Sequence, residues 1–247
     1  MKILISNDDG ICSNGIKELC KVLCQNNEIL VVAPDNNRSA VAHSLSINKK
    51  LKLKKEVINN CNAYSLSGTP ADCIKFARLY FKDFTPDIVI AGINKGHNLG
   101  SDILYSGTVS IAYEAAFFGH ITFAFSAFSL GESNFELYAY YAEKIIKNLM
   151  PYSSPRSIWN INFPDKSFSK IKGIKITRLG KQLYSDEYVS CGNNEFVLKG
   201  ELVEHNENIV DCDVEWIKKG YITITPIVFD KTDYNKIREV KNLCERL

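Results

Sequence analysis

Two adjacent carboxylates, Asp8 and Asp9, come directly after a short apolar segment. That segment, residues 2–6, is rich in branched apolar side chains, which predicts a buried strand. Carboxylates at the end of a buried strand repel each other and resist the loss of water, so they need either a cation or a dense set of hydrogen-bond donors. Because Asn, Asp and Gly are also common turn residues, Asn7–Gly10 could instead form a solvated turn.

Two further polar loops favour the first interpretation. Residues 28–33 and 87–91 are apolar segments that predict strands, and each precedes a loop rich in oxygen ligands and hydrogen-bond donors. In open α/β sheets, ligands bind at the carboxyl ends of the strands, where such loops converge. The candidate side chains are Arg38, Ser39, His43 and Ser44 in the first loop, and Asn94, Lys95, His97, Asn98, Asp102, Ser106 and Thr108 in the second.

The oxygen-rich side chains indicate hard-cation chemistry. Carboxylate, hydroxyl and amide oxygens suit Mg²⁺, Mn²⁺ or Ca²⁺ better than zinc or copper, and such an ion keeps positions open for water or phosphate oxygens. Ser106, Gly107 and Thr108 begin a predicted helix, where backbone N–H groups and the positive end of the helix dipole suit an anion such as phosphate. The same residues could form an ordinary Ser/Thr N-cap.

The absence of several known phosphate and nucleophile motifs excludes some classes of enzyme. The chain has no GxxxxGK[ST], GxGxxG or GxSxG sequence, so a P-loop nucleotidase, a dinucleotide fold and a nucleophile elbow have no support. An aspartyl-phosphate enzyme would need an aspartate two residues before Asp9, where this chain has Asn7. A metal site that activates water directly remains. His43 and His97 could be acid–base residues there, or hydrogen-bonded loop histidines.

The order of predicted elements indicates an α/β fold. Up to about residue 165, strands alternate with helices, which predicts a Rossmann-like, doubly wound, mostly parallel sheet in three α/β/α layers. We expect residues 1–165 to form the metal- and phosphate-binding core. Residues 166–247 predict a β-rich extension with a terminal helix, which completes the sheet within the same structural domain and forms an oligomerisation arm. The predicted helices are 15–23, 70–80, 108–118, 135–150 and 232–246, and the further strands are 121–127, 157–163, 174–178, 195–203 and 221–227.

Two other regions are less regular. Lysines 50, 52, 54 and 55 alternate with Leu51 and Leu53, which predicts a strand with one solvent-exposed face. The lysines could attract a polyanion, but charged residues that protect an exposed sheet edge are the favoured interpretation. Residues 182–219 are polar and show no clear pattern.

Composition excludes several classes of protein. The 247 residues include 45% apolar and 23% charged residues, and a net charge of +2 gives no support for a nucleic-acid or membrane partner. No apolar run reaches the roughly 20 residues of a membrane span, and no signal peptide is visible. The eight cysteines show no CxxC pair and no zinc-like spacing, so we expect buried free thiols and a cytoplasmic protein.

Seven segments, in order, closely resemble motifs of the SurE family, the stationary-phase survival protein E nucleotidases. Together they cover most of the chain, from residue 7 to residue 226. Any one of them is a weak signal, whereas seven in the same order are a strong one. They are NDDG (7–10), APDNNRSAVAHS (33–44), SGTPADC (67–73), PDIVIAGINKGHNLGSDILYSGTVSIAYEA (86–115), WNINFP (159–164), TRLG (177–180) and GYITITP (220–226).

The resemblance implies a metal-dependent phosphatase that acts on nucleoside 5′- and 3′-monophosphates. It also implies a Rossmann-like core and a C-terminal arm exchanged between subunits, as a homodimer or homotetramer. One Mg²⁺ or Mn²⁺ ion per subunit would be expected, with Asp8 or Asp9 also accepting a proton from the attacking water. By motif position the metal ligands would be Asp8, Asp9, Ser39 and Asn94, and the phosphate-binding residues Asn98, Ser106, Gly107 and Thr108.

Some residues depart from the family pattern, and two other functions stay open. Such changes could alter substrate preference or arm packing, although none removes an expected metal ligand. A nucleotide sensor without turnover, or another metal-assisted reaction such as glycosyl transfer from a nucleotide sugar, could use similar carboxylates. The departures are Cys12-Ser13-Asn14, Ala40, Ala42, Ser110, Ala115 and Cys212.

Overall fold

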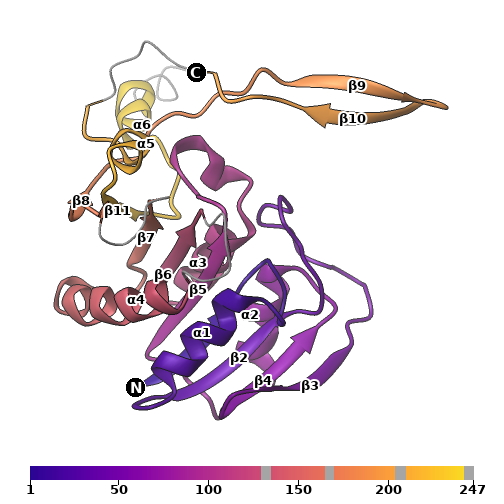
Figure 1. The fold of residues 1–247 in the computed structure, drawn as a ribbon, viewed down its shortest axis with the longest axis vertical. Helices are drawn as coiled ribbons and strands as arrows, with labels where there is room; N and C mark the ends of the chain where they lie inside the picture. The colour runs from indigo at the N-terminus through magenta and orange to yellow at the C-terminus, as the bar shows by residue number, and fades with distance from the viewer. Residues whose placement is uncertain (129–134, 165–169, 204–209, 242–247) are drawn as a thin grey trace.

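A nine-stranded sheet with helices on both faces forms the body of the molecule (Figure 1). The computed structural model describes residues 1–128, 135–164, 170–203 and 210–241. The sheet strands are β1 (Lys2–Ser6), β2 (Glu28–Pro34), β3 (Leu53–Ile58), β4 (Cys61–Leu66), β5 (Ile88–Lys95), β6 (Ile121–Ala127), β7 (Ile158–Phe163), β8 (Ile174–Ile176) and β11 (Ile222–Ile227). A separate hairpin comprises β9 (Glu187–Gly192) and β10 (Glu195–Lys199). The helices are α1 (Asn14–Leu23), α2 (Pro70–Tyr80), α3 (Gly107–Phe117), α4 (Phe135–Leu149), α5 (Asp213–Lys218) and α6 (Tyr234–Val240), with 3-10 turns η1 (Gly100–Leu104) and η3 (Met150–Tyr152).

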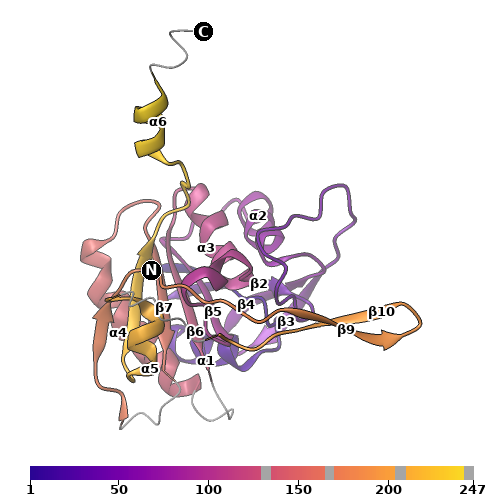
Figure 2. The same ribbon diagram turned by 90° about the horizontal axis from the view of Figure 1, so that it is seen from above.

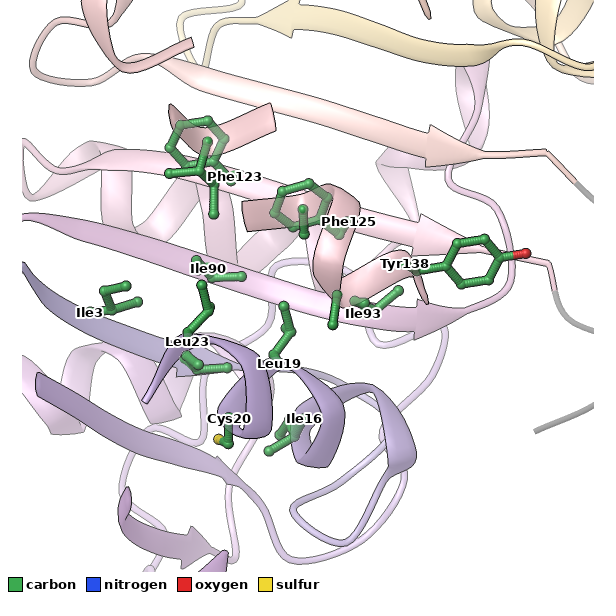
Figure 3. Close-up of a cluster of buried hydrophobic side chains, with 14 of the residues drawn as sticks. Ile3, Ile16, Leu19, Cys20, Leu23, Ile90, Ile93, Phe123, Phe125 and Tyr138 are labelled. Carbon is green, nitrogen blue, oxygen red and sulfur yellow. The ribbon is translucent and has the colours of Figure 1, made fainter. Parts of the chain in front are cut away.

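Strand β1 illustrates how the two helical layers arise. Ile3 and Ile5 are buried in the cluster that includes α1 and α4, whereas Leu4 is buried in the cluster that includes α2 and α3. The reason is that successive side chains of a strand point to opposite faces of the sheet. Figure 3 shows this first cluster, in which side chains of α1 pack against β5 and the cluster continues to β1, β6 and α4. The predicted three-layer α/β/α arrangement is confirmed.

The strand order is β3-β4-β2-β1-β5-β6-β7-β11-β8. From β4 through β7 the neighbouring strands of this series run parallel. The chain passes from β1 to β2 on one side and later places β5 on the other, so the strand order reverses at β1. Ligands of doubly wound sheets bind outside the carboxyl ends of the strands at such a reversal, and Asp8 and Asp9 leave β1 there. The predicted doubly wound sheet is confirmed.

The lysine-rich segment forms the edge of the sheet. Strand β3 is the outermost strand and pairs antiparallel with β4, and its Lys54 and Lys55 are exposed. This placement agrees with the edge-protecting interpretation of the lysines. Strand β4 was not predicted, because its sequence CNAYSL mixes polar and apolar residues without a clear period and its pairing with β2 and β3 determines its conformation.

The last part of the chain completes the sheet and then leaves it. Strand β11 pairs antiparallel with β7, and β8 pairs parallel with β11. The β9–β10 hairpin projects from the body, and α6 extends away from it (Figures 1 and 2). The unpatterned region 182–219 therefore contains the hairpin and α5. Among the described residues, no helix combines the length and apolarity needed to cross a bilayer.

Several predicted boundaries in this part were wrong. Strand β8 ends at Ile176 instead of residue 178, and β10 ends at Lys199, before Gly200, although an isolated bridge at Leu202 continues the pairing. A glycine contributes no side chain to the cross-strand packing, which weakens the strand there. The terminal helix starts at Tyr234 because the Asp233 side chain caps it. The predicted end of that helix, and the predicted domain boundary at residue 165, lie outside the described residues.

Candidate active site

Asn7 shapes the loop that carries the two carboxylates. Its side chain is fully buried, and its Nδ2 donates to the Gly10 carbonyl oxygen at 3.1 Å and to Ser13 Oγ at 2.6 Å. Its Oδ1 accepts the Gly10 N–H at 3.1 Å. Ser13 is also the N-cap of α1, so Asn7 ties the end of β1 to the start of that helix. A turn at Asn7–Gly10 was one of the predicted alternatives. The bond from Asn7 to the N-cap residue of α1 was not predicted.

Asp8 is the most deeply buried of the candidate ligands on this loop. It is 4% exposed, and the Thr108 hydroxyl donates to its Oδ1 at 2.5 Å. Burial raises the pKa of Asp8 to about 6, against the opposing effect of the Thr108 hydroxyl and with a further increase from the Asp9 carboxylate. The hydrogen bonds that Asp8 accepts therefore do not balance the cost of burying its charge.

Asp9 connects the first loop to the end of β5. Its Oδ2 accepts the backbone N–H of Lys95 at 2.9 Å, and burial raises its pKa despite that bond. The neighbouring residue Asn94 is 9% exposed, and its Nδ2 donates to the Gly96 carbonyl oxygen at 2.9 Å. With the nitrogen engaged as a donor, the Asn94 carbonyl oxygen is the side-chain atom suited to a cation. Two of the sequence-predicted ligands thus lie on directly linked segments.

Ser39 lies on the loop after β2, and this loop is anchored to Asp8. The Arg38 N–H donates to the Asp8 backbone carbonyl at 2.7 Å. The exposed Ser39 side chain donates to Asn37 Oδ1 at 2.8 Å, and its backbone N–H donates to the same oxygen at 2.9 Å. The structure therefore brings the Ser39 loop against Asp8 while the hydroxyl hydrogen is directed to Asn37. The hydroxyl lone pairs are the atoms that could serve a cation.

The N-terminus of α3 lies directly against Asp8. Ser106 caps this helix, because its Oγ accepts the Val109 N–H at 3.0 Å. A Cβ at Gly107 would lie 2.7 Å from Asp8 Cβ and 2.8 Å from Asp8 Oδ2, so a residue larger than glycine would displace the carboxylate. The Thr108 hydroxyl, predicted to meet phosphate, is engaged with Asp8 instead. The positive end of a helix dipole thus lies beside a pair of carboxylates.

Asn98 belongs to a buried amide network that the sequence analysis did not foresee. Its Nδ2 donates to Ser126 Oγ at 2.7 Å, and its N–H donates to Asn162 Oδ1 at 2.8 Å. Its carbonyl oxygen accepts from Asn160 Nδ2 at 2.9 Å and from Asn162 Nδ2 at 3.0 Å. These contacts hold the loop after β5 to the ends of β6 and β7, a positioning role. The sequence signal that could have suggested this network is the pair of asparagines, Asn160 and Asn162, in the predicted strand 157–163.

The remaining loop candidates also have protein partners. His43 Nε2 lies 2.8 Å from Glu114 Oε2, and His97 Nε2 lies 2.7 Å from the Phe163 carbonyl oxygen. The Arg38 guanidinium lies 3.6 Å from Asp35 Oδ1. Lys75 Nζ also contacts Glu114, at 2.8 Å from Oε1.

The C-terminal extension fixes the turn that precedes α3. Asp213 is fully buried and accepts the N–H groups of Gly100 at 2.9 Å, Gly180 at 2.7 Å and Val214 at 2.8 Å. Burial still raises its pKa, although these bonds lower it. Asp102, a loop candidate, accepts hydrogen bonds from Gln182 and Tyr184 of the extension. Sequence alone gave no reason to link residues 180–213 to η1.

The residues around Asp8 and Asp9 fit a hard divalent cation. Two adjacent carboxylates with raised pKa values are a region of uncompensated negative charge, which a cation would balance. Among the described residues, no group of three or more His, Cys, Asp or Glu side chains is arranged to hold a metal ion. Any metal here would therefore use hydroxyl and amide oxygens beside the two carboxylates, the ligand set of Mg²⁺ or Mn²⁺.

Comparisons with known proteins find similar sequences and a similar structure. The profile of the family described as Survival protein SurE matches residues 3–186. A protein of Alkaliphilus metalliredigens named 5′-nucleotidase SurE is 39% identical over 254 residues, covering 98% of this chain and 98% of that relative. A protein of Clostridium botulinum (strain Eklund 17B) with the same name is 39% identical over 252 residues, covering 99% and 100%. The crystal structure of the SurE protein from Aquifex aeolicus is similar with a TM-score of 0.83 and 35% identity, covering 98% of this chain and 99% of that chain.

Proposed function

Because the chain belongs to the SurE family, we propose that it hydrolyses nucleoside 5′-monophosphates, and also 3′-monophosphates, to nucleoside and inorganic phosphate. The observation that carries the proposal is the contact between Asp8 and the N-terminus of α3 at Gly107. It supports a cation site at Asp8 directly beside a phosphate site at the start of α3. This combination suits a phosphate monoester, whose charged oxygens can be shared between a cation and helix N–H groups.

One divalent cation, Mg²⁺ or Mn²⁺, would be held by oxygens of Asp8, Asp9, Ser39 and Asn94. When bound, such an ion supplies Lewis acidity and a water of lowered pKa. The N–H group of Gly107 and the Ser106 hydroxyl would orient the phosphate.

Between the two carboxylates, we assign proton acceptance to Oδ1 of Asp9. Asp9 is half-exposed and its Oδ2 already accepts the Lys95 N–H, whereas Asp8 is buried.

A screen of phosphate release tests the proposal. Nucleoside 5′- and 3′-monophosphates would be incubated with the protein and Mg²⁺, Mn²⁺ or Ca²⁺, with EDTA as the control. We expect release that depends on the divalent ion. Absence of release with every ion and nucleotide, from protein shown by circular dichroism to be folded, would overturn the assignment.

The matched variants are Gly107→Ala and Gly192→Ala. An added Cβ at Gly107 would displace the Asp8 carboxylate, so we expect phosphate release to fall by at least about a hundredfold, as a misplacement of about 1 Å can do. At Gly192, in the exposed hairpin, an added Cβ has no heavy atom within 4 Å, although its φ of +86° makes the substitution strained. Gly107 has no positive φ, so the loss expected there comes from the clash with Asp8. Gly192→Ala, which is strained but meets no other atom, should retain activity.

We further propose that the β9–β10 hairpin and α6 bind a second copy of this chain, in a homodimer or homotetramer. Tyr188, Phe196 and Leu198 of the hairpin are exposed by 71%, 59% and 53%, and the hairpin projects from the body (Figures 1 and 2). An isolated hairpin has little stability of its own, so apolar side chains on it favour a protein partner. Light scattering of a Phe196→Ser, Leu198→Ser variant should show a smaller particle, and an unchanged particle would contradict the proposal.

The protein is also proposed to act in the cytoplasm. The seven cysteines within the described part of the chain are free thiols, which fits a reducing compartment. The expectation that they are buried was wrong for Cys12 and Cys191, which are exposed. Cys244 lies outside the described residues.

A further inference from the structure

We infer that the cavity along the outer face of α3 binds the nucleoside part of the substrate, with the base against Phe229. This inference rests on the proposed phosphate-ester activity and adds the site that selects nucleotides among phosphate esters. The cavity has a volume of about 360 Å³, within the usual range for small-molecule sites.

The cavity begins at the candidate phosphate site and follows one face of α3. Ser106 lines it and is also the N-cap of the helix that touches Asp8. Ser110, Tyr113 and Phe117 also line it, and they follow Ser106 at the helical spacings of four, seven and eleven residues. The rise from Ser106 to Tyr113 is about 10 Å along the helix axis. A ligand with its phosphate at Ser106 would therefore extend along this face.

The walls offer flat apolar surface with polar groups at the rim. Tyr113, Phe117 and Phe229 are lining residues, and the His43 ring is stacked with that of Tyr113 at 6.4 Å between centroids and 25° between planes. A nucleobase has the complementary form, because its faces are apolar and its edges carry donors and acceptors. Base–aromatic stacking of this kind tolerates any base.

The charges in the cavity suit an anionic ligand. The buried Glu114 carboxylate is held by His43 and Lys75, each at 2.8 Å, and these contacts lower its pKa although its burial acts in the opposite direction. Its negative charge is thus balanced within the wall. Lys231 Nζ lies 5.7 Å from the Tyr113 ring centroid, so it adds positive charge beside the stacking surface. A phosphate ester with an apolar acyl chain would make no use of these rim groups.

Two further segments complete the cavity, and one of them is the loop that also carries Ser39. His43 comes from the loop after β2, and Phe229 and Lys231 follow β11 in the C-terminal extension. Phe229 is only half-buried, so its replacement should leave the fold intact. It is therefore the residue with which to test the inference.

The test compares AMP with ribose 5-phosphate, which has the same phosphate ester but no base. In Phe229→Ala, we expect the ratio of kcat/KM for AMP to kcat/KM for ribose 5-phosphate to fall about 5- to 100-fold, the effect of losing one stacking partner. Tyr140→Ala on α4, an exposed aromatic on the other face of the sheet, is the matched control and should keep the ratio. An unchanged ratio in Phe229→Ala would overturn the inference.

Calorimetric binding of adenosine separates this inference from the proposed activity. Adenosine has no phosphate, so its binding does not depend on turnover or on a metal. We expect the wild-type protein to bind adenosine and Phe229→Ala to bind it at least about fivefold more weakly. If the protein binds adenosine but releases no phosphate, the proposed activity fails and the nucleoside site stands. If adenosine does not bind, or binds equally to both proteins, the nucleoside site is refuted whatever the activity.

Discussion

Two buried aspartates near the carboxyl ends of the strands have opposite relations to their surroundings. Asp213 accepts three backbone N–H groups, from Gly100, Gly180 and Val214, and the protein itself thus satisfies its carboxylate. Asp8 accepts the Thr108 hydroxyl, and the Asp9 carboxylate beside it is repulsive. Burial raises the pKa of both side chains, so the direction of the pKa shift does not distinguish them. What differs is the neighbouring charge, because the Asp9 carboxylate raises the pKa of Asp8 further, whereas no like charge in the ranges that the structure describes acts on Asp213.

This difference separates a structural carboxylate from a functional one. A buried charge that the fold leaves poorly compensated reduces stability, and it persists where function requires it. Asp213 joins the C-terminal extension to the turn before α3, whereas the charge of Asp8 is the one that a cation would balance under the proposed function. The comparison can be tested because the two residues should respond oppositely to the same substitution.

Asp8→Asn and Asp213→Asn should give the largest effects, in different measurements. Asp8→Asn removes a proposed metal ligand, and a bound metal supplies several kcal/mol of transition-state stabilisation, so kcat/KM for AMP should fall at least about 100-fold. Its free energy of unfolding should stay equal or rise, because a poorly compensated charge is lost. Asp213→Asn would turn an amide N–H group toward a backbone N–H donor and should lower the free energy of unfolding by about 1–3 kcal/mol.

Phosphate-release kinetics and urea unfolding of both variants provide the check. Activity below the unfolding transition should remain within several-fold of wild type in Asp213→Asn. If Asp8→Asn loses stability and keeps its activity, the functional assignment of Asp8 fails.

A pair of buried threonines tests whether the hydroxyl that donates to Asp8 supports the cation site. The Thr108 hydroxyl donates to Asp8, whereas the buried Thr223 hydroxyl has no hydrogen-bond partner within the part of the chain that the structure describes. Thr108→Val should weaken the apparent affinity for Mn²⁺ about 10- to 100-fold, as loss of an outer hydrogen bond to a metal ligand typically does. Thr223→Val should leave Mn²⁺ affinity unchanged and raise the free energy of unfolding by about 1 kcal/mol.

Mn²⁺ titrations of phosphate release, together with thermal unfolding, measure both effects. Equal Mn²⁺ affinities in the two valine variants would show that the Thr108 hydroxyl does not support the cation site.

The pH dependence of stability isolates the buried charge of Asp213. Its folded-state pKa is raised, so the folded protein holds this proton more tightly than the unfolded chain, whose Asp pKa is about 3.9. The free energy of unfolding contributed by Asp213 should therefore fall as the pH rises from about 4 to the folded-state pKa, and stay constant above it. The difference in unfolding free energy between wild type and Asp213→Asn, measured in urea at each pH, should follow this curve. A difference that rises with pH in that window would contradict the sign.

The surroundings of Asp8 could be predicted from the sequence, whereas those of Asp213 could not. Asp8, Asp9, Asn94 and the start of α3 follow strands with strong local patterns, so the doubly wound topology was enough to place them at one edge. Asp213 lies in a region of weak pattern, and its partners Gly100 and Gly180 are distant in sequence. Such an arrangement depends on packing between segments, which local periodicity does not encode. The engagement of the Thr108 hydroxyl by Asp8 was missed for the same reason.

The smallest expected effect concerns Cys212, the residue before Asp213. It is the N-cap of α5 with extended backbone, and its side chain makes no capping hydrogen bond. Cys212→Ser supplies a hydroxyl that can accept an N–H of the first turn, so the free energy of unfolding should rise by about 0.5 kcal/mol, at the low end of measured N-cap effects. Cys73→Ser is the matched control, since that buried thiol lies inside α2, where a hydroxyl has no free N–H to accept and should lower stability. Thermal unfolding of both variants decides the point. A loss of stability in Cys212→Ser as large as that in Cys73→Ser would mean that the start of α5 is held by Asp213 alone and has no use for a side-chain cap.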